Sequence, residues 1–366
     1  MPVLRSIAER FGAGRPLDGV TVGACLHVTA ETAVLVQALT AGGAHVALCA
    51  PNPLSTQDDV ADTLRGGGAD VHAAHGQDPT PGIATVVGTA PRVTLDDGAD
   101  LVLALHAQGD LPAGFLGGTE ETATGLALLR RAALRAPVLA VNEARSERVF
   151  NDHYGTGQST LDGILRATNL LMAGRTVVVL GYGFTGKGIA LRARGAGAQV
   201  IVCEIDPLRA LDARMEGFAV LPALEAAERG DVFITVTGAQ RVLRAEHFAR
   251  MKDGAVLANA GHFDVEIDLA ALGPGEPVLP LVTRHRVGDR ALHLLTAGRV
   301  VNLAAGQGHP ASVMDISFAL QALAVEHLVR CAGDLAPGVQ PVPEALDREV
   351  ARLKLASLGV EIDTAG

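Results

Sequence analysis

The sequence predicts an α/β protein made of two Rossmann-like parallel-sheet domains and a short C-terminal tail. Three observations lead to this fold class. Apolar strand-like runs alternate with amphipathic helix-like segments along most of the chain. The chain has 366 residues, which suggests two domains. With 43 glycines and only 3% aromatic residues, its composition is typical of many strand–turn–helix junctions.

The first series of alternating elements runs from about residue 19 to 141. It predicts strands near 20–28, 45–50, 92–105 and 137–141, with helix-like segments at 31–43, 55–67 and 120–134. Short apolar runs separated by helices are typical of a parallel βαβ sheet. We expect residues 1–150, completed by 311–335, to form one domain that binds the substrate.

A second series begins near residue 159 with a helix-like segment. Strand-like runs follow at 176–180, 198–206, 230–238 and 254–263, and a long apolar helix is predicted at 311–329. This series predicts a second parallel sheet over 156–307, and 336–366 are expected to form a tail. Residues between the two sheets would line a cleft.

Charge and cysteine content narrow the function. The net charge is −10 and no basic tract occurs, which argues against nucleic acid or an anionic membrane as partner. No apolar run reaches the roughly 20 residues of a membrane span, and the N-terminus lacks the apolar core of a signal peptide. The four cysteines form no CxxC pair, so we expect buried thiols, no metal site and a reducing cytoplasm.

The stretch "VVVLGYGFTGKG" predicts a dinucleotide site. Gly181, Gly183 and Gly186 have GxGxxG spacing after an apolar strand and before a helix, which permits close approach of the backbone to a pyrophosphate. Glu204 lies 18 residues after Gly186, at the end of the next strand. A carboxylate there accepts ribose hydroxyls and repels a 2′-phosphate, so we expect NAD rather than NADP.

Long motifs carry a resemblance to one family. "GYGFTGKG", "EIDP", "MEGF", "MKDGAVLANAGHFDVEID", "GRVVNLAAGQGHP" and "LHVTAETAVL" resemble S-adenosylhomocysteine hydrolase, and "YGTGQST" resembles its shorter archaeal and thermophile-type branch. The resemblance implies that bound NAD⁺ oxidises the 3′-hydroxyl of a nucleoside. The 3′-ketone acidifies C4′, the 5′ substituent leaves by β-elimination, water adds, and NADH reduces the ketone again.

The resemblance also implies site residues in the substrate domain. His27, Thr29 and Glu31 match positions that hold adenine, although "TAET" is also compatible with a helix cap. Asp97 matches a residue near the 5′ position, and Glu121 a carboxylate that binds the sugar. The remaining implied positions are His262 as an acid or base, Gln307 and His309 at the adenine side, and the cofactor contacts Thr122, Thr124, Phe184, Thr185, Thr237, Gly238, Gly261 and Asn302.

One segment departs from the family. Aligned on Phe150, the positions of the family's catalytic Lys, Asp and Asn are occupied by Glu147, Asn151 and Asp152. Composition does not explain Glu147, because a chain with three lysines and 27 arginines would replace Lys by Arg. Loss of activity, leaving a silent NAD-binding regulator, is a second interpretation. The third is altered chemistry, with Glu147 as base or acid at a raised pKa and Asn151 also in the reacting group.

We expect altered chemistry: a divergent lyase or dehydratase that removes water from C5′ of an adenine nucleoside. Hydroxide is a poor leaving group, since water has a pKa of about 15.7 against about 8.5 for a thiol. It must leave protonated, which a carboxylic acid or His262 could achieve. The product would carry the 4′,5′-alkene of angustmycin-type antibiotics. Ordinary S-adenosylhomocysteine hydrolysis is the alternative, and Asp152 is expected near NAD. A homodimer or homotetramer is expected in either case.

Overall fold

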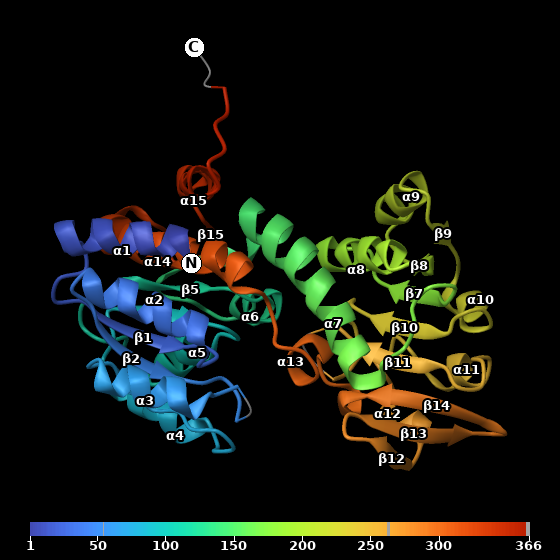
Figure 1. Ribbon diagram of the computed structural model, residues 1–366. Coiled ribbons are helices and arrows are strands. Elements are labelled where there is room, and N and C mark those ends of the chain that lie inside the picture. Colours follow the sequence, from blue (N-terminus) through green and yellow to red (C-terminus); the bar gives the residue numbers. More distant parts are fainter. Residues whose placement is uncertain (54, 262–263, 364–366) are drawn as a thin grey trace. The chain divides into compact units, whose positions relative to one another are not determined.

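The computed structural model of the protein describes residues 1–53, 55–261 and 264–363. The chain folds into two compact units, one formed by Met1–Glu147 and Ala311–Gly366 and the other by Arg148–Pro310 (Figure 1). Each unit contains one sheet flanked by helices, so the predicted two-domain α/β fold is confirmed. Residues 336–366, expected as a separate tail, fall within the first unit.

The sheet of the first unit is parallel throughout, with the order β15-β6-β5-β4-β1-β2-β3. Its five central strands are short and almost fully buried, as expected of a sheet covered on both faces, whereas the two edge strands are partly exposed. The edge strand β15 comes from the expected tail. The strands are β1 (Thr21–Cys25), β2 (His45–Cys49), β3 (Asp70–Val71), β4 (Val93–Asp96), β5 (Gly117–Glu120), β6 (Pro137–Ala140) and β15 (Gly338–Pro341).

Helices α1, α2 and α14 pack together in this unit, while α4 and α5 contact each other and strands β1, β2 and β4 (Figure 1). The helices are α1 (Pro2–Gly14), α2 (Ala30–Ala41), α3 (Asp58–Gly66), α4 (Thr80–Gly88), α5 (Asp100–Ala107), α6 (Ala123–Leu129), α14 (Ala311–Cys331) and α15 (Glu344–Ser357), with short 3₁₀ turns at Val141–Glu143 and Ala332–Asp334.

The expectation of a strand over 92–105 was wrong. Strand β4 ends at Asp96, and helix α5 begins at Asp100. The Asp96 carboxylate accepts hydrogen bonds from the backbone N–H groups of Leu101 and Val102, at 2.7 and 3.2 Å. These are unsatisfied donors of the first helical turn, so Asp96 stabilises the start of the helix.

Helix α14 forms part of the core of the first unit. Within the described ranges it is the one segment that is long and apolar enough to cross a membrane by length and composition. Of its most apolar stretch of 18 residues, 67% is buried inside the protein. The helix contacts β4, β5, α1 and α2. Core packing therefore accounts for its apolar surface.

The second unit contains a mostly parallel sheet with the order β12-β13-β14-β11-β10-β7-β8-β9. Strands β12, β13 and β14 form antiparallel hairpins that the sequence analysis did not predict. The strands are β7 (Thr176–Leu180), β8 (Gln199–Cys203), β9 (Ala219–Val220), β10 (Val232–Thr235), β11 (Val256–Asn259), β12 (Gly275–Leu279), β13 (Val282–Val287) and β14 (Arg290–Leu295).

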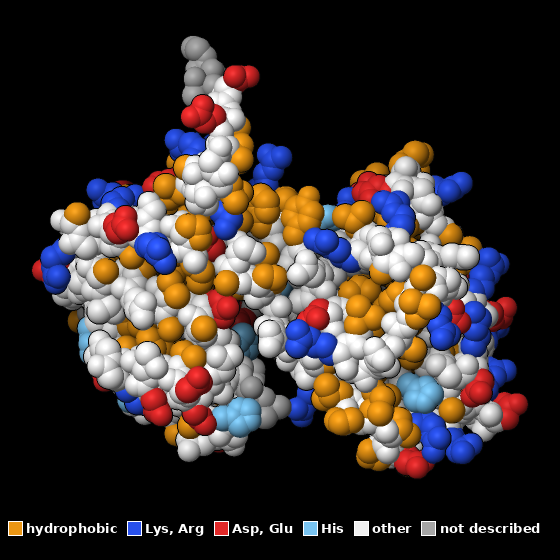
Figure 2. Space-filling model, in the orientation of Figure 1, with side chains coloured by type: hydrophobic (Ala, Val, Ile, Leu, Met, Phe, Trp, Pro, Cys, Tyr) orange, Lys and Arg blue, Asp and Glu red, His pale blue; other side chains and the backbone are white. Residues whose placement is uncertain are grey.

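The helices of this unit are α7 (Gly157–Thr168), α8 (Phe184–Gly195), α9 (Pro207–Met215), α10 (Ala223–Ala227), α11 (Ala245–Phe248), α12 (Leu269–Leu272) and α13 (Val301–Ala304), with a 3₁₀ turn at Thr296–Gly298. A π-helix, Glu147–Thr156, begins at the unit boundary. Helix α9 exposes the apolar side chains of Leu208, Leu211 and Met215, and Figure 2 shows hydrophobic side chains over this helix.

Candidate functional site

The residues predicted to act on the substrate gather where the strand order of the first sheet reverses. Strand β1 has β2 on one side and β4 on the other, so loops leaving β1 and β4 diverge and open a crevice at their carboxyl ends. His27 follows β1 and Asp97 follows β4. Their Nε2 and Oδ2 atoms are 3.1 Å apart. The structure therefore joins two predicted residues from motifs 70 positions apart.

The ion pair sets the protonation of His27. Burial lowers the pKa of the imidazole, but the charge of Asp97 and its hydrogen bond outweigh burial and leave the pKa of His27 above its usual value. Asp97 is almost completely buried, with 7% of its side chain exposed. An imidazole held by a buried carboxylate can donate a hydrogen bond or, when protonated, a proton to a substrate oxygen or sulfur.

Glu121, predicted to bind the sugar, lies directly after strand β5. Gln321 of helix α14 donates its Nε2 hydrogen to Glu121 Oε2 at 2.9 Å. Burial, followed by the charge of Asp97, raises the pKa of Glu121 well above its usual value, although the bond from Gln321 opposes this. A raised pKa favours the neutral acid, and this suits a carboxyl group that acts as a general acid or base.

Two buried carboxylates that the sequence analysis missed stiffen the loops of this site. Asp96 and Glu120 are paired neighbours on β4 and β5 and are fully buried. Glu120 accepts from the backbone N–H of Gly98 at 3.1 Å and of Thr122 at 2.8 Å. Burial raises the pKa of Asp96 to about 7 and that of Glu120 to about 8. Asp96 directly precedes Asp97, and Glu120 directly precedes Glu121. The acidic pairs "DD" and "EE" could therefore have indicated a second, supporting carboxylate beside each predicted site residue.

The side chain of Thr122 is engaged inside the first unit. It donates to Glu120 Oε1 at 2.5 Å and accepts from Gly125 N at 3.3 Å, which caps helix α6. A Cβ on Gly125 would lie 2.3 Å from Glu120 Cδ, so only glycine allows this approach. Thr124, the other predicted cofactor contact here, has a buried hydroxyl with no hydrogen-bond partner in the structure. Of the two hydroxyls, Thr124 is the better placed for a ligand.

Glu147, at the position of the family's lysine, is 1% exposed. The backbone before it is fixed by helix α15: Arg145 N and Ser146 N donate to the carboxylate of Asp347 at 2.9 and 3.2 Å. The charge of Glu147 contributes to the raised pKa of Glu121, so the two carboxyl groups are electrostatic neighbours. The structure thus brings Asp97, Glu121, Glu147 and His27 into one acidic cluster within the first unit.

The cap expected at "TAET" exists, but Glu31 takes no part in it. Thr29 is the N-cap of α2, and its hydroxyl accepts from Thr32 N at 3.5 Å. A reciprocal capping box needs Glu or Gln at the third helical position, which Thr32 occupies. Glu31 at the second position is therefore not required by the helix. Its half-buried carboxylate leaves the adenine-binding prediction open.

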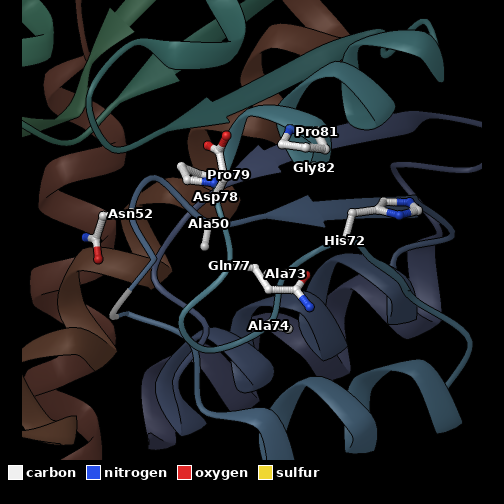
Figure 3. A pocket seen from close by; sticks show the side chains of 10 residues that line it. All are labelled: Ala50, Asn52, His72, Ala73, Ala74, Gln77, Asp78, Pro79, Pro81 and Gly82. Carbon is white, nitrogen blue, oxygen red and sulfur yellow. The ribbon is translucent and has the colours of Figure 1, made fainter.

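A small cavity of about 80 Å³ lies in the first unit beside the carboxyl ends of β2 and β3. Figure 3 shows that its polar side chains, among them Asn52, His72 and Asp78, point in different directions and do not converge. Ligand sites measure about 300–1,000 Å³ and carry converging polar groups. This cavity is too small for a nucleoside, so the acidic cluster remains the candidate site.

In the second unit the glycine motif forms the loop between β7 and α8. Gly181 has φ +106°, and a Cβ there would lie 2.7 Å from Val236 O. A Cβ on Gly186 would lie 2.1 Å from Gly181 O, so Gly186 lets the helix pack on the turn. Gly183 has open space, with Arg209 Nη1 at 3.7 Å as its nearest contact. This division of roles is that of a pyrophosphate-binding loop.

Phe184 and Thr185 begin helix α8, where backbone N–H groups are free for an anion. Phe184 is exposed and lies 5.9 Å from the guanidinium of Arg148. Glu204, predicted to bind ribose, stands at the end of β8. Its Oε2 accepts from Tyr182 N at 2.7 Å, and its Oε1 from Ile205 N at 2.7 Å. The carboxylate thus holds the glycine loop and retains further lone pairs for hydroxyl donors.

Thr237, Gly238 and Gly261 are positioned by two buried residues that the sequence analysis missed. Glu266 accepts from Thr237 N at 2.9 Å, Thr237 Oγ1 at 2.8 Å and Gly238 N at 2.8 Å. Asn259 Oδ1 accepts from Gly261 N at 2.8 Å. A Cβ on Gly261 would lie 1.9 Å from Glu266 Oε1. His262, the predicted acid or base, lies outside the described residues.

Asn302, predicted to hold the nicotinamide amide, lies on α13. It is 4% exposed, and its Oδ1 has no partner in the structure. A buried amide oxygen without a donor costs free energy unless a ligand supplies one. The glycine loop, the bare start of α8 and this amide fit a dinucleotide. No group of three or more metal-ligating side chains occurs among residues 1–53, 55–261 and 264–363.

The predicted His309 and Asn151 also fall in the second unit. His309 Nε2 and Thr156 Oγ1 are 2.9 Å apart, and the same hydroxyl lies 3.5 Å from the Asn151 carbonyl oxygen. Asp152 is half-buried, and burial raises its pKa to about 7, partly opposed by the charge of Arg148. Gln307 is exposed in the loop between α13 and α14. Glu147 belongs to the first unit and Asn151 and Asp152 to the second.

Comparison with family models agrees with this division. Residues 1–112 match the model described as S-adenosyl-L-homocysteine hydrolase, and residues 152–308 match its NAD binding domain. The chain is 52% identical to an adenosylhomocysteinase of Gloeobacter violaceus over 100% of this chain and 88% of that protein. It is 51% identical to an S-inosyl-L-homocysteine hydrolase of Methanopyrus kandleri, over 99% and 89% of the two chains.

Solved structures agree at the level of the fold. The A chain of dipicolinate synthase from Bacillus subtilis superimposes with a TM-score of 0.51 at 16% identity, over 87% of this chain and 98% of that one. The family models confirm the family resemblance and NAD as cofactor, and the relatives' names agree with the family. They favour the hydrolase alternative over the dehydratase that the substitutions had suggested.

Proposed function

The chain belongs to the S-adenosyl-L-homocysteine hydrolase family, and from that premise we propose that it removes the 5′ substituent of an adenine nucleoside, with S-adenosyl-L-homocysteine as substrate. The observation that carries the proposal is the acidic cluster at the strand-order reversal of the first unit. His27, Asp97 and Glu121 supply there an imidazole with a raised pKa, a buried carboxylate and a carboxyl group with a raised pKa. We further propose that the protein works in the cytoplasm as a homo-oligomer.

Residues of the second unit would hold NAD⁺ through the glycine loop, Glu204 and Asn302. When bound, this cofactor supplies reversible hydride transfer at the sugar C3′. The role we assign to Glu121 is proton transfer at the sugar hydroxyls, because its raised pKa makes its carboxylate a stronger base than an ordinary carboxylate. The role we assign to His27 is proton donation to the departing 5′ atom, with Asp97 holding the imidazole as a cation.

We propose adenine rather than hypoxanthine as the base. A carboxylate at Glu31 accepts from the exocyclic amine of adenine, whereas hypoxanthine presents a carbonyl oxygen at the same place and would be repelled. Glu31 is half-buried and is not used by the helix cap, which supports this choice. Comparing turnover of S-adenosyl- and S-inosyl-L-homocysteine tests it: equal efficiency for the two substrates would contradict the proposal.

A second candidate, loss of water from a 5′-hydroxyl nucleoside, is favoured by one observation. Glu147 places a buried carboxyl group beside Glu121 where the family has a lysine. Two neighbouring carboxyl groups hold a shared proton more readily than one, and a departing hydroxide needs such a proton. This candidate also accounts for the choice of Glu over Arg in an arginine-rich chain.

One experiment separates the candidates. NAD-loaded protein is incubated with S-adenosyl-L-homocysteine and, separately, with adenine nucleosides that carry a free 5′-hydroxyl, and the products are weighed by mass spectrometry. Release of homocysteine supports the hydrolase. Loss of one water from a nucleoside, without homocysteine release, supports the dehydratase and overturns the first proposal. Neither product, with NAD bound, indicates a silent NAD-binding protein.

A further inference from the structure

Gln321 combines three features that the roles described above do not explain. It is fully buried on helix α14, yet it carries two polar atoms. Its Nε2 donates to Glu121 at 2.9 Å. Its Oε1 has no hydrogen-bond partner in the structure. A buried amide oxygen without a donor is unfavourable unless another molecule supplies the donor.

The backbone that carries Gln321 is held firmly. Asp315, on the same helix, is fully buried and accepts from Val3 N at 3.2 Å and Leu4 N at 3.0 Å. Lys354 Nζ of helix α15 lies 3.0 Å from the same carboxylate. Helix α14 also packs on strands β4 and β5, which lead to Asp97 and Glu121. Gln321 therefore cannot easily move to satisfy its oxygen elsewhere.

The geometry of an amide places the free oxygen close to Glu121. The Oε1 and Nε2 atoms share one carbon, so a donor that reaches Oε1 also lies near the carboxyl group that Nε2 holds. In the structure the amide nitrogen faces Glu121, which is the orientation that lets the carboxylate accept when it is ionised. The missing donor must come from the side of the acidic cluster or from a trapped water.

A sugar diol has the matching chemistry. Adjacent hydroxyl groups present two O–H donors a short distance apart, and recognition requires two adjacent acceptors. The carboxyl group of Glu121 offers one acceptor. Gln321 Oε1 offers a second acceptor beside it, because Gln321 is hydrogen-bonded to Glu121. Threonine and serine hydroxyls of the first unit do not replace this donor, because no bond from them to Oε1 forms in the structure.

We propose that Gln321 is a substrate-binding residue whose amide links Glu121 to a ribose hydroxyl, with Nε2 donating to the carboxylate and Oε1 accepting from the hydroxyl. This rests on the proposed nucleoside substrate. The selectivity of the site for ribose would then depend on helix α14, which follows the second unit in the sequence but belongs to the first unit. It also couples the protonation of Glu121 to the presence of the sugar, since both contacts share one amide.

Binding of three nucleosides tests the proposal without relying on turnover. Adenosine, 2′-deoxyadenosine and 3′-deoxyadenosine are titrated by calorimetry into NAD-loaded wild type and Gln321→Met. We expect the substitution to weaken adenosine binding by about 10- to 100-fold. For the deoxynucleoside that lacks the contacted hydroxyl, we expect wild type and variant to bind equally. Gln37→Met, an exposed change on α2, serves as control and should leave all three affinities unchanged.

The outcomes are distinct. If Gln321→Met leaves adenosine binding unchanged, or weakens all three nucleosides by the same factor, the proposal is overturned while the proposed function stands. If wild type binds none of the three nucleosides, the proposed function itself fails.

A second variant guards against misfolding of Gln321→Met. Gln321→Glu keeps an acceptor oxygen in place but sets a like charge beside Glu121. At about pH 6, where one of two adjacent carboxyl groups retains a proton, it should bind adenosine more tightly than at about pH 8. Identical adenosine affinity at the two pH values, with wild type as reference, would count against the proposed contact.

Discussion

The two units share the same reversal of strand order, but they surround their carboxylates differently. In each sheet the first strand, β1 or β7, has its successor on one side and a later strand on the other, so a crevice opens at the carboxyl ends. In the second unit Glu204 and Glu266 are bound by backbone N–H groups of the loops around that crevice. In the first unit the carboxyl groups of Asp97, Glu121 and Glu147 lie near one another instead.

The difference teaches what each unit is built to do. A carboxylate that accepts several backbone N–H bonds rigidifies a loop and stabilises its own charge. Carboxyl groups that share a buried crevice raise one another's pKa and so hold protons near neutral pH. The contrast supports a second unit that holds the dinucleotide and, under the proposed function, a first unit that moves protons.

The largest expected effect comes from Glu121→Gln in the first unit. Removing the titrating group should lower turnover by about 100- to 10,000-fold, since proton transfer is lost while the hydrogen bond from Gln321 can be replaced. The NAD content, measured after denaturation of the protein, should stay at the wild-type level because the second unit is untouched.

The matched control for this variant is Glu9→Gln, an exposed change on α1 that should leave turnover unchanged. Full activity of Glu121→Gln would show that the proton chemistry lies elsewhere. Loss of NAD from this variant would break the division of roles between the units.

Gly186→Ala is the corresponding test of the second unit. Its Cβ would come within 2.1 Å of Gly181 O, so the glycine loop must deform and NAD binding should fall by at least about 100-fold. Adenosine binding to the first unit can be followed separately by calorimetry. Gly195→Ala, later on the same helix, meets nothing within 4 Å and should retain NAD. NAD retention in Gly186→Ala would sink the assignment of this loop.

Sequence patterns placed the glycine loop, which follows the predicted strand 176–180, at the carboxyl edge of the second sheet. Strand prediction did not place Asp97 or Glu121, because Asp97 fell inside the wrongly predicted strand over 92–105 and strand β5, which precedes Glu121, was not predicted. The family resemblance identified these two residues and His27. Partners that depend on tertiary contact were not predicted. Gln321 is 200 positions from Glu121, and local periodicity carries no information on such a pair.

Two structural features that were not predicted have recognisable signals in the sequence. The hairpin of β13 and β14 turns at Gly288 and Asp289, and Gly-Asp between strand-like runs is a recognised hairpin signal. Asp96 was read as part of a strand over 92–105, although a carboxylate before "GAD" is well suited to cap the helix that follows. The remaining misses depend on contacts between distant parts of the sequence: Glu266 accepts from Thr237 N, and Asp347 of helix α15 accepts from Arg145 N.

The chain's few lysines allow a matched comparison of charge burial. Lys354 pairs with Asp315, which is fully buried, whereas Lys252 pairs with Asp231 near the surface of the second unit. Lys354→Met leaves a buried carboxylate with only its two backbone donors and should cost about 2–3 kcal/mol of unfolding free energy. Lys252→Met should cost less than about 1 kcal/mol. Denaturant unfolding measures both, and equal losses would contradict the contrast in burial.

The last comparison is a pH dependence of stability that runs against the usual direction for carboxyl groups. The pKa of Glu120 is raised to about 8 and that of Asp96 to about 7, chiefly by burial. Between their ordinary values and these raised values, the folded state binds more protons than the unfolded state. Their contribution to stability is therefore complete at acidic pH and is lost as the pH rises.

Each of the two groups should remove up to about 1.4 kcal/mol of unfolding free energy per pH unit across its window. Calorimetric melting between about pH 5.5 and 8.5 should thus show the transition of the first unit moving to lower temperature as the pH rises. In Glu120→Gln the group no longer titrates, so that slope should flatten, because the amide keeps one acceptor oxygen for Gly98 and Thr122. A melting temperature that rises with pH, or an unchanged slope in Glu120→Gln, would mean that Glu120 is ionised in the folded protein. Other groups of the first unit would then carry the bound protons.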